Sequence, residues 1–222
     1  MKAAPAAPRA RLAKPTPPAA RPRGENMTRQ VIADAAERAF ARHGYDSATV
    51  RNILAAAGVR SGLMSYYFPS KDELYSYVIS RKEPALRAAF LACLPDAGDA
   101  QHLSAEACVR AYFSFFFETA QDPLLGDYLR LLVRSSTDYE QAAVRSNLAR
   151  FDFIHETMLA LLARAVPQAP LKRLRAALLF MEAAVTTLLI TTGLAEHRLR
   201  DGTSAPSLVT DLADLVLRGI SA

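Results

Sequence analysis

Apolar residues recur at intervals of three and four along the stretch that follows residue 26, as they do on the buried face of an α-helix. Thr28 is placed to cap the N-terminus of this helix, and Gly44 after His43 is a typical stop signal. The pattern therefore predicts a first helix from about Thr28 to His43. Its apolar face consists of Val31, Ile32, Ala35, Ala36, Ala39 and Phe40.

Two shorter helices are predicted next, separated by a glycine turn. The first runs from about Thr49 to Ala57, with the Thr49 hydroxyl as its cap, and Gly58 ends it. The second, from Ser61 to about Tyr67, is too short to be stable alone and depends on packing against its neighbours. Two short helices joined at a glycine turn are typical of a helix-turn-helix.

The remaining helices are predicted from a capping box and from prolines. Ser70 and Glu73 have the spacing of a capping box, which marks a helix start. Proline lacks the backbone N–H and tends to end a helix, so Pro84 and later prolines divide the rest of the chain. We expect helices near residues 85–94, 103–120, 124–134, 138–165, 171–195 and 206–218. Gly is sparse and helix-favouring residues are abundant, so the expected fold class is all-α.

The positive charge of the chain is concentrated in residues 1–26. This stretch carries six cationic residues and only Glu25 as an acid, so its net charge of +5 equals that of the whole chain. Its Pro- and Ala-rich composition cannot bury enough surface to order itself, and we expect a disordered tail. One alternative is an arm that lies along DNA phosphates or in a minor groove. Another is a transit peptide, against which the closely spaced prolines count.

The sequence carries no motif of enzyme chemistry. It has no glycine-rich phosphate loop, no H-E-x-x-H and no nucleophile elbow, and its four histidines are scattered. Cys93 and Cys108 form no C-x-x-C, so we interpret them as small core residues in a reducing compartment. Because these motifs are missing, we expect a protein that is not an enzyme and uses neither a metal nor a cofactor. Because no secretory signal is present, we expect it in the cytoplasm.

One apolar stretch, residues 176–195, approaches the roughly 20 residues of a membrane-spanning helix. Glu182 and four threonines within it count against a span, although that alternative stays open. The interpretation that we favour is a helix buried by its own core and by a partner chain. Paired with the helix near 206–218, it would form a two-fold interface that buries Leu178, Val185, Leu189, Leu212 and Leu215.

The stretch Arg29–Leu74 resembles the DNA-binding domain of the TetR family of transcriptional regulators. Several independent features coincide at fixed spacing over about a fifth of the chain. They are Ala36 and Phe40 before His43-Gly44-Tyr45, then Thr49-Val50 with Ile53, then Ala57-Gly58-Val59, and finally Tyr66-Tyr67-Phe68-Pro69-Ser70-Lys71 with Leu74. Two positions depart from the family pattern: Leu54, where a small alanine is common, and Ser65, where a tyrosine commonly touches the DNA backbone.

The resemblance implies that the helix from Ser61 to Tyr67 enters the major groove of DNA. Arg60 could meet a guanine edge or a phosphate, and Leu63 a thymine methyl group. The residues expected near base edges or the flanking backbone are Arg60, Ser61, Gly62, Leu63, Ser65 and Tyr66.

Contacts to phosphates fix the register of a protein on DNA without reading sequence. By the same resemblance we expect them from Thr49, Tyr67 and Lys71. Each has a purely structural alternative, because Thr49 can serve only as a cap, Tyr67 as a core residue and Lys71 as a surface residue.

Aromatic residues are dense in the C-terminal part, where the run from Tyr112 to Phe117 surrounds a helix with rings. Small-molecule sites combine apolar walls with a few polar anchors, for which His155, Glu182 and Thr186 are candidates. Ordinary core packing is the alternative for each of them. The expected ligand-binding residues are Phe113, Phe116, Phe117, Tyr128, Phe151, His155, Met181, Glu182 and Thr186.

We therefore expect a basic tail over residues 1–26, a helix-turn-helix DNA-binding domain over 27–84, and a helical ligand-binding and dimerisation domain over 85–222. The resemblance implies a ligand-responsive regulator, a repressor released from a near-palindromic double-stranded DNA operator by a small hydrophobic effector and acting as a homodimer. The helix from Lys71 to Glu83 would transmit the effect of the ligand. The alternative is a helical hydrophobe carrier at the membrane surface whose helix-turn-helix does not read DNA.

Overall fold

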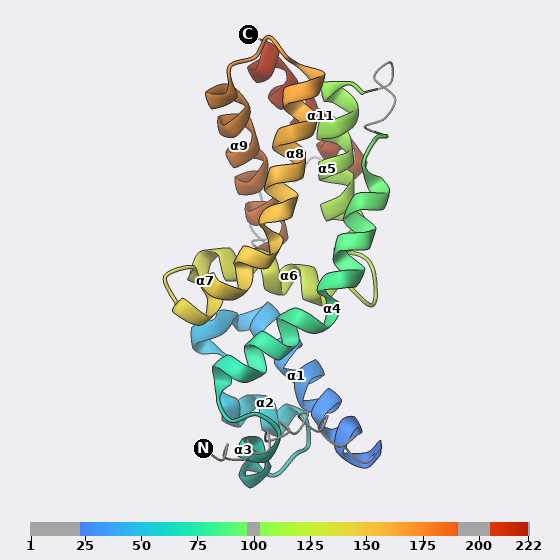
Figure 1. The fold of residues 1–222 in the computed structure, drawn as a ribbon. Helices are drawn as coiled ribbons and strands as arrows, with labels where there is room; N and C mark the ends of the chain where they lie inside the picture. The colour runs from blue at the N-terminus through green and yellow to red at the C-terminus, as the bar shows by residue number, and fades with distance from the viewer. Residues whose placement is uncertain (1–22, 97–102, 191–204, 222) are drawn as a thin grey trace, which may run out of the picture.

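The computed structural model describes residues 23–96, 103–190 and 205–221 (Figure 1). Within these ranges the chain forms helices and no strand, which confirms the predicted all-α class. The helix-turn-helix end consists of α1 (Arg23–Ser47), α2 (Val50–Ala56), the 3-10 turn η1 (Ser61–Leu63), α3 (Met64–Tyr67) and the first half of α4 (Lys71–Cys93).

The other end of the molecule is a helical bundle (Figure 1). It contains α5 (Ala105–Thr119), α8 (Asp152–Ala165), α9 (Leu171–Ile190) and α11 (Ala205–Ser221), with the second half of α4 beside them. Between the bundle and the helix-turn-helix lie α6 (Gly126–Ser135), η2 (Ser136–Asp138), α7 (Ala142–Leu148) and η3 (Ala149–Phe151).

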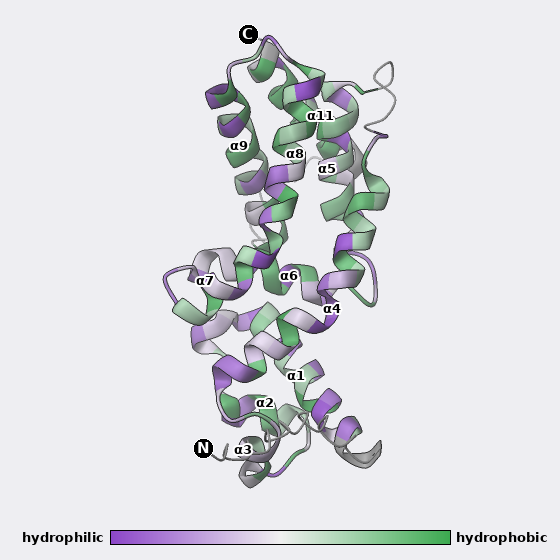
Figure 2. Cartoon of the chain, viewed as in Figure 1, coloured by the Kyte–Doolittle hydropathy of each residue, from purple (hydrophilic) through white to green (hydrophobic). Residues whose placement is uncertain are grey.

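Each end has a packed apolar core. Phe40, Ile53 and Phe68 are buried beneath the helix-turn-helix, and Phe113 and Leu178 are buried in the bundle. Figure 2 shows that apolar residues are concentrated in the bundle helices and that α7 is more polar. Burial of such side chains is the main favourable term that holds short helices such as α2 and α3 in place.

The predicted start of the first helix is wrong. α1 begins at Arg23, five residues before the expected cap at Thr28, so residues 23–26 belong to the helix and not to the tail. Once a helix is nucleated by its packed part, each further residue adds a hydrogen bond at little cost. Val31 is also 44 % exposed and does not face the core. Residues 1–22, which make up most of the predicted tail, lie outside the described residues.

Two predicted helix boundaries in the rest of the chain are wrong as well. α4 continues through Pro84 to Cys93, because the loss of one backbone hydrogen bond bends a well-packed helix without ending it, and Figure 1 shows α4 bending along its length. The single helix expected over 138–165 is instead divided among η2, α7, η3 and α8. The Ser136 and Thr137 hydroxyls donate to backbone carbonyls three residues back, which competes with regular helix.

Candidate nucleic-acid interface

The turn between α2 and α3 depends on Gly58. Its φ is 66°, a left-handed conformation that favours glycine, and a Cβ added there would meet no atom within 4 Å. The glycine is therefore required by the backbone and not by a lack of space. After the turn, the Val59 N–H donates to the Leu54 carbonyl at 3.0 Å, which fixes the direction in which the chain enters η1.

The side chains expected to face DNA form one exposed edge, which we call the reading edge. Phe68 is buried directly behind it, with Val59 and Met64 partly buried against the same core. This arrangement packs one side of a very short helix against the core and exposes the other side to solvent. The reading edge consists of Arg60, Ser61, Gly62, Leu63, Ser65 and Tyr66, all of them exposed.

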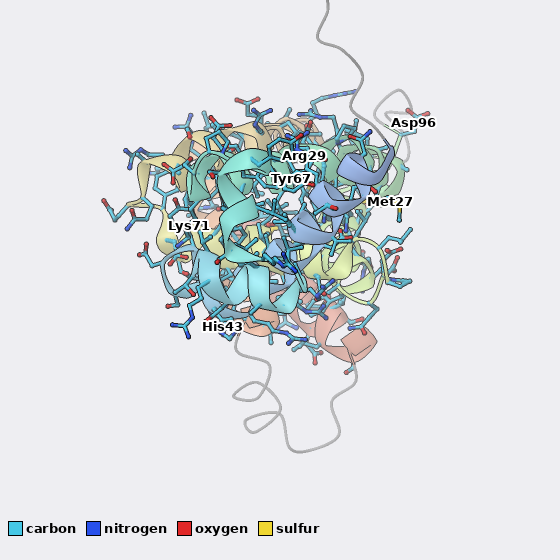
Figure 3. The ribbon with its side chains drawn as sticks, turned by 90° about the horizontal axis from the view of Figure 1, so that it is seen from below. Met27, Arg29, His43, Tyr67, Lys71 and Asp96 are labelled. Atoms are coloured by element: carbon cyan, nitrogen blue, oxygen red, sulfur yellow. The ribbon has the colours of Figure 1, made fainter. Side chains whose placement is uncertain are left out.

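The three predicted phosphate contacts lie around the reading edge, and Figure 3 views this end of the molecule with Tyr67 and Lys71 labelled. Thr49 is exposed and caps α2, because its Oγ1 accepts a hydrogen bond from the Asn52 N–H at 3.2 Å. Tyr67 is half-buried and packs edge to face against Tyr66, with ring centroids 5.0 Å apart. Thr49 thus lies at the start of α2 and Tyr67 at the end of α3, and their contact with DNA stays a prediction.

Lys71 begins α4 and is also engaged within the protein. Its Nζ donates to the Asp46 carbonyl at 3.3 Å and lies 4.3 Å from the centre of the Tyr45 ring. Burial lowers the pKa of Lys71, while Asp46 and Asp72 oppose this. Ser70, the cap of α4, accepts from the Glu73 N–H at 3.1 Å, as the capping box predicts.

Arg29 is a structural residue that the sequence analysis did not single out. Its guanidinium lies 3.9 Å from the centre of the Tyr77 ring and 5.2 Å from that of Phe68, the residue behind the reading edge. Such cation–π contacts hold α1 against α4 and support Phe68 from below. The pattern of charged and apolar residues along α1 does not indicate the role of Arg29, because the two rings that it contacts lie about 40 to 50 residues further along the chain.

The last turn of α1 is bonded to the layer of α6. The Tyr45 N–H donates to Asp138 Oδ2 at 2.7 Å, and Arg134 Nε donates to the Ala41 carbonyl at 3.0 Å. From α4, the Tyr75 hydroxyl donates to Ser135 Oγ at 2.7 Å. The helix-turn-helix is therefore held by α6 and η2 as well as by its covalent continuation into α4.

A buried carboxylate makes a second connection. Glu37 of α1 is 5 % exposed and accepts from Arg81 Nη2 at 2.6 Å and from Lys82 Nζ at 2.7 Å. Arg81 also pairs with Asp34 at 2.7 Å, and Lys82 donates to the Leu124 carbonyl, just before α6, at 2.7 Å. One ionic cluster thus joins α1, the middle of α4 and the segment that precedes α6.

The predicted ligand-binding residues are only partly brought together. Phe113, Phe116 and Met181 are buried in the core of the bundle, Tyr128 is buried on α6, and Phe117 lines a cavity described below. Phe151 and Thr186 are half-buried. Their part in binding a ligand stays a prediction.

Two of the expected polar anchors do meet. His155 Nδ1 on α8 lies 2.9 Å from Glu182 Oε1 on α9, with both side chains 41 % exposed. Tyr112 lies close enough for the Glu182 charge to act on it, and its pKa is raised well above the ordinary value, mainly by burial and further by Glu182.

The expected dimer face needs correction. Leu178, Val185 and Leu189 are already buried within the chain, because they face the core of their own bundle. The apolar side chains left exposed on α9 and α11 include Leu179, at 66 %, and Leu215, at 60 %. A shallow cavity of about 360 Å³ lies between the two helices on that side. None of the described helices has the length and apolar character of a bilayer span.

Cys93 is not the core residue that we predicted, since it is exposed at the end of α4, whereas Cys108 is buried. The Cys93 thiol lies against the end of its own helix, with Sγ 2.9 Å from the Phe90 carbonyl. Although the residue is exposed, partial desolvation of its thiol raises the pKa of Cys93 to about 11, and the Glu118 charge adds to the effect.

Comparisons with known proteins agree at both ends of the chain. Residues 32–78 match the family described as bacterial regulatory proteins, tetR family, and residues 110–222, about half of the chain, match the tetracyclin repressor-like C-terminal domain. A transcriptional repressor of the helix-turn-helix type from Mycobacterium tuberculosis is 39 % identical over 61 residues, 28 % of this chain and 32 % of that protein. The repressor AcnR of Corynebacterium diphtheriae is 36 % identical over 67 residues, 30 % of this chain and 35 % of that protein. The match thus spans about a third of the length of these relatives.

Solved structures extend the likeness in fold to nearly the whole chain. A TetR-like regulator from Rhodococcus sp. RHA1 superposes with a TM-score of 0.65 at 22 % identity, covering 91 % of this chain and 100 % of that one. A TetR-family regulator from Streptomyces coelicolor gives 0.63 at 19 % identity, covering 89 % and 97 %. The chain belongs to the TetR family of bacterial transcriptional regulators.

Proposed function

We propose that this DNA-binding regulator is a repressor that binds a near-palindromic operator as a homodimer and is released from it by a small hydrophobic effector. The observation that carries the proposal is the reading edge, a row of exposed side chains from Arg60 to Tyr66 fixed from behind by buried Phe68. A short helix held in this way presents the same side chains at the same angle to every DNA site. Family membership supports this function and not that of a hydrophobe carrier.

The reading edge offers two kinds of contact. Arg60 carries a planar fork that suits guanine O6 and N7, whereas Leu63 can meet only a thymine methyl group or exclude a base. A Cβ added at Gly62 would meet no protein atom within 4 Å, so the lack of a side chain there leaves room for close approach of DNA. Thr49, Tyr67 and Lys71 would fix the register on the phosphates.

Dimerisation would use the exposed apolar face of α9 and α11. Leu179, Phe180 and Leu215 are all large apolar side chains left in water by the single chain. Apolar faces of this kind mark protein interfaces, and a two-fold axis between two copies of α9 and α11 would give a four-helix contact. Two reading edges related by that axis would reach successive major grooves, roughly 34 to 36 Å apart, which requires a near-palindromic site.

The effector would act through the contacts that hold α1. α6 and η2 bond to the last turn of α1, and the Glu37 cluster joins α1 to α4. A ligand that binds one arrangement of the bundle more tightly than the other shifts the population of the two, and a ligand that binds both equally shifts nothing. We infer that movement of α6 is transmitted to α1 as well as through α4.

Selection from a random duplex library tests the proposal. The purified protein should enrich one sequence with two half-sites about one helical turn apart. Arg60→Ala should weaken binding to that sequence by roughly tenfold to a hundredfold, as expected for the loss of a bidentate base contact. Arg150→Ala is the charge-matched control, because Arg150 is exposed on η3, in the middle layer of the molecule, and should bind as the wild type does. Failure to enrich any sequence would overturn the proposal.

A further inference from the structure

A cavity of about 540 Å³ opens between α5 and the first turns of α11. This volume lies in the range of roughly 300 to 1,000 Å³ typical of small-molecule sites. We call it the α5–α11 groove. The side chains along it that bear on its chemistry are Arg110, Phe117 and Glu118 from α5, and Val209 and Thr210 from α11.

The guanidinium of Arg110 is already neutralised by the protein. Its Nε lies 2.8 Å from Glu106 Oε1 and its Nη2 lies 3.7 Å from Asp214 Oδ1. Its Nη1 donates to Thr210 Oγ1 at 3.2 Å. Each guanidinium nitrogen thus faces a protein group, and the two carboxylates offset the positive charge that Arg110 would otherwise offer to an anionic ligand.

The charge of the groove is negative. Glu118 lines it, is exposed, and forms no ion pair within the described part of the chain. Glu106, Glu118 and Asp214 carry three negative charges against the single positive charge of Arg110, so these four described side chains sum to −2. A cation that enters the groove would approach the Glu118 carboxylate at close range, where opposite charges attract.

Phe117 supplies an aromatic surface beside that carboxylate. The neighbouring rings of Phe115 and Phe116 are buried and pack against each other with centroids 5.1 Å apart. Phe117 is only partly buried, lines the groove, and has no ring partner among the described residues. A ring face next to a carboxylate that has no ion pair among the described residues is a combination that binds alkylammonium groups, because both attract positive charge.

We propose that the α5–α11 groove binds an organic cation, with an apolar body on Phe117 and Val209 and its positive charge at Glu118, and that this cation is the effector. The inference rests on the proposed ligand-responsive function. It places the ligand at a site that shares only Phe117 with the set predicted from the sequence.

Tetraphenylphosphonium and tetraphenylborate test the proposal, because these two ions have nearly the same size and shape and opposite charge. Calorimetric titration in sodium buffer should show binding of the cation and at least tenfold weaker binding of the anion. Glu118→Gln, an exposed and nearly isosteric change, should weaken cation binding by about fivefold to tenfold, as should Phe117→Leu. Glu140→Gln, an exposed carboxylate between η2 and α7, is the matched control and should leave binding unchanged.

Equal binding of the two ions, or equal binding by Glu118→Gln and the wild type, would overturn the groove as a cation site. The selection from the random duplex library shows whether the proposed DNA-binding function holds, independently of whether the groove binds a cation. If a duplex is enriched but the cation does not bind, the regulator stands and the groove inference falls. If the cation binds in the groove but leaves the affinity for the enriched duplex unchanged, the cation is not an effector and this inference is again overturned.

Discussion

The backbone N–H of Tyr45 donates to the carboxylate of Asp138 at 2.7 Å, which joins the end of α1 to the turn after α6. The same carboxylate closes over Gly44, where an added Cβ would lie 2.7 Å from Asp138 Oδ2. Gly44 has a φ of 76°, so the helix breaks there and turns its next N–H toward η2. This contact between α1 and η2 thus depends on a glycine and on one side chain 93 residues away from Tyr45.

Gly44→Ala should destabilise the protein by about 2 kcal/mol, because alanine is strained at positive φ and its Cβ would press on Asp138. Urea denaturation of the single variants and of Gly44→Ala with Asp138→Ala measures the two contributions. Removal of the carboxylate should relieve the steric part only, so the double variant should be more stable than the sum of the single effects predicts. Simple additivity would mean that Asp138 does not restrict Gly44.

Glu37→Gln should lower the free energy of unfolding by about 3 kcal/mol, because it leaves Arg81 and Lys82 without the carboxylate that accepts from both. Glu106→Gln is the control. Glu106 pairs with Arg110 one turn away on the surface of α5, and loss of an exposed pair of this kind costs at most about 1 kcal/mol. Denaturation midpoints that shift equally in the two variants would show that the Glu37 cluster does not hold the two ends together.

Gly58→Ala and Gly62→Ala should separate folding from DNA binding. The first change puts alanine at a φ of 66° and should cost about 1 to 2 kcal/mol of stability. The second has free space in the protein and no positive φ, so thermal stability should stay unchanged while affinity for the selected duplex falls. If the Gly62→Ala protein bound the selected duplex with wild-type affinity, Gly62 would not lie at the DNA interface.

Cys93 should react slowly with iodoacetamide despite its exposure. A thiol with a pKa of about 11 is almost entirely protonated at pH 8, so its alkylation should be on the order of a hundredfold slower than that of an ordinary thiol. The rate, followed by mass spectrometry of the Cys93 peptide, should rise tenfold for each pH unit from 7 to 9.5. A plateau near pH 9 would show an unperturbed thiol.

The helix-turn-helix could be predicted closely because its signals are local. The Thr49 cap, the Gly58 turn and the Ser70 cap each act through the backbone within three residues, and all three are found where the sequence indicates. The same reasoning failed at Pro84, because packing along α4 outweighs the loss of one hydrogen bond. It also failed at Thr28, because a local cap competes with a helix that is already nucleated.

Contacts between distant residues could not be predicted from periodicity. Glu37 and Arg81 are 44 residues apart, and the sequence alone would indicate that each is a solvated charge on the surface of its helix. Polar residues within apolar helices gave a better signal, since His155 and Glu182 were singled out in this way and do meet. The groove residues Arg110 and Glu118 were missed, because a surface cavity depends on how α5 and α11 pack and leaves no pattern in either helix.

Protection of guanine N7 from dimethyl sulfate tests the central claim most directly, because that atom lies in the major groove, where the reading edge is proposed to bind. On the duplex selected from the random library, two protected patches should appear in successive major grooves, about one helical turn apart and related by two-fold symmetry. Arg60→Ala should lose the protection of a guanine in each patch while Arg150→Ala keeps it. Protection spread evenly along the duplex, or none in the major groove, would contradict the account.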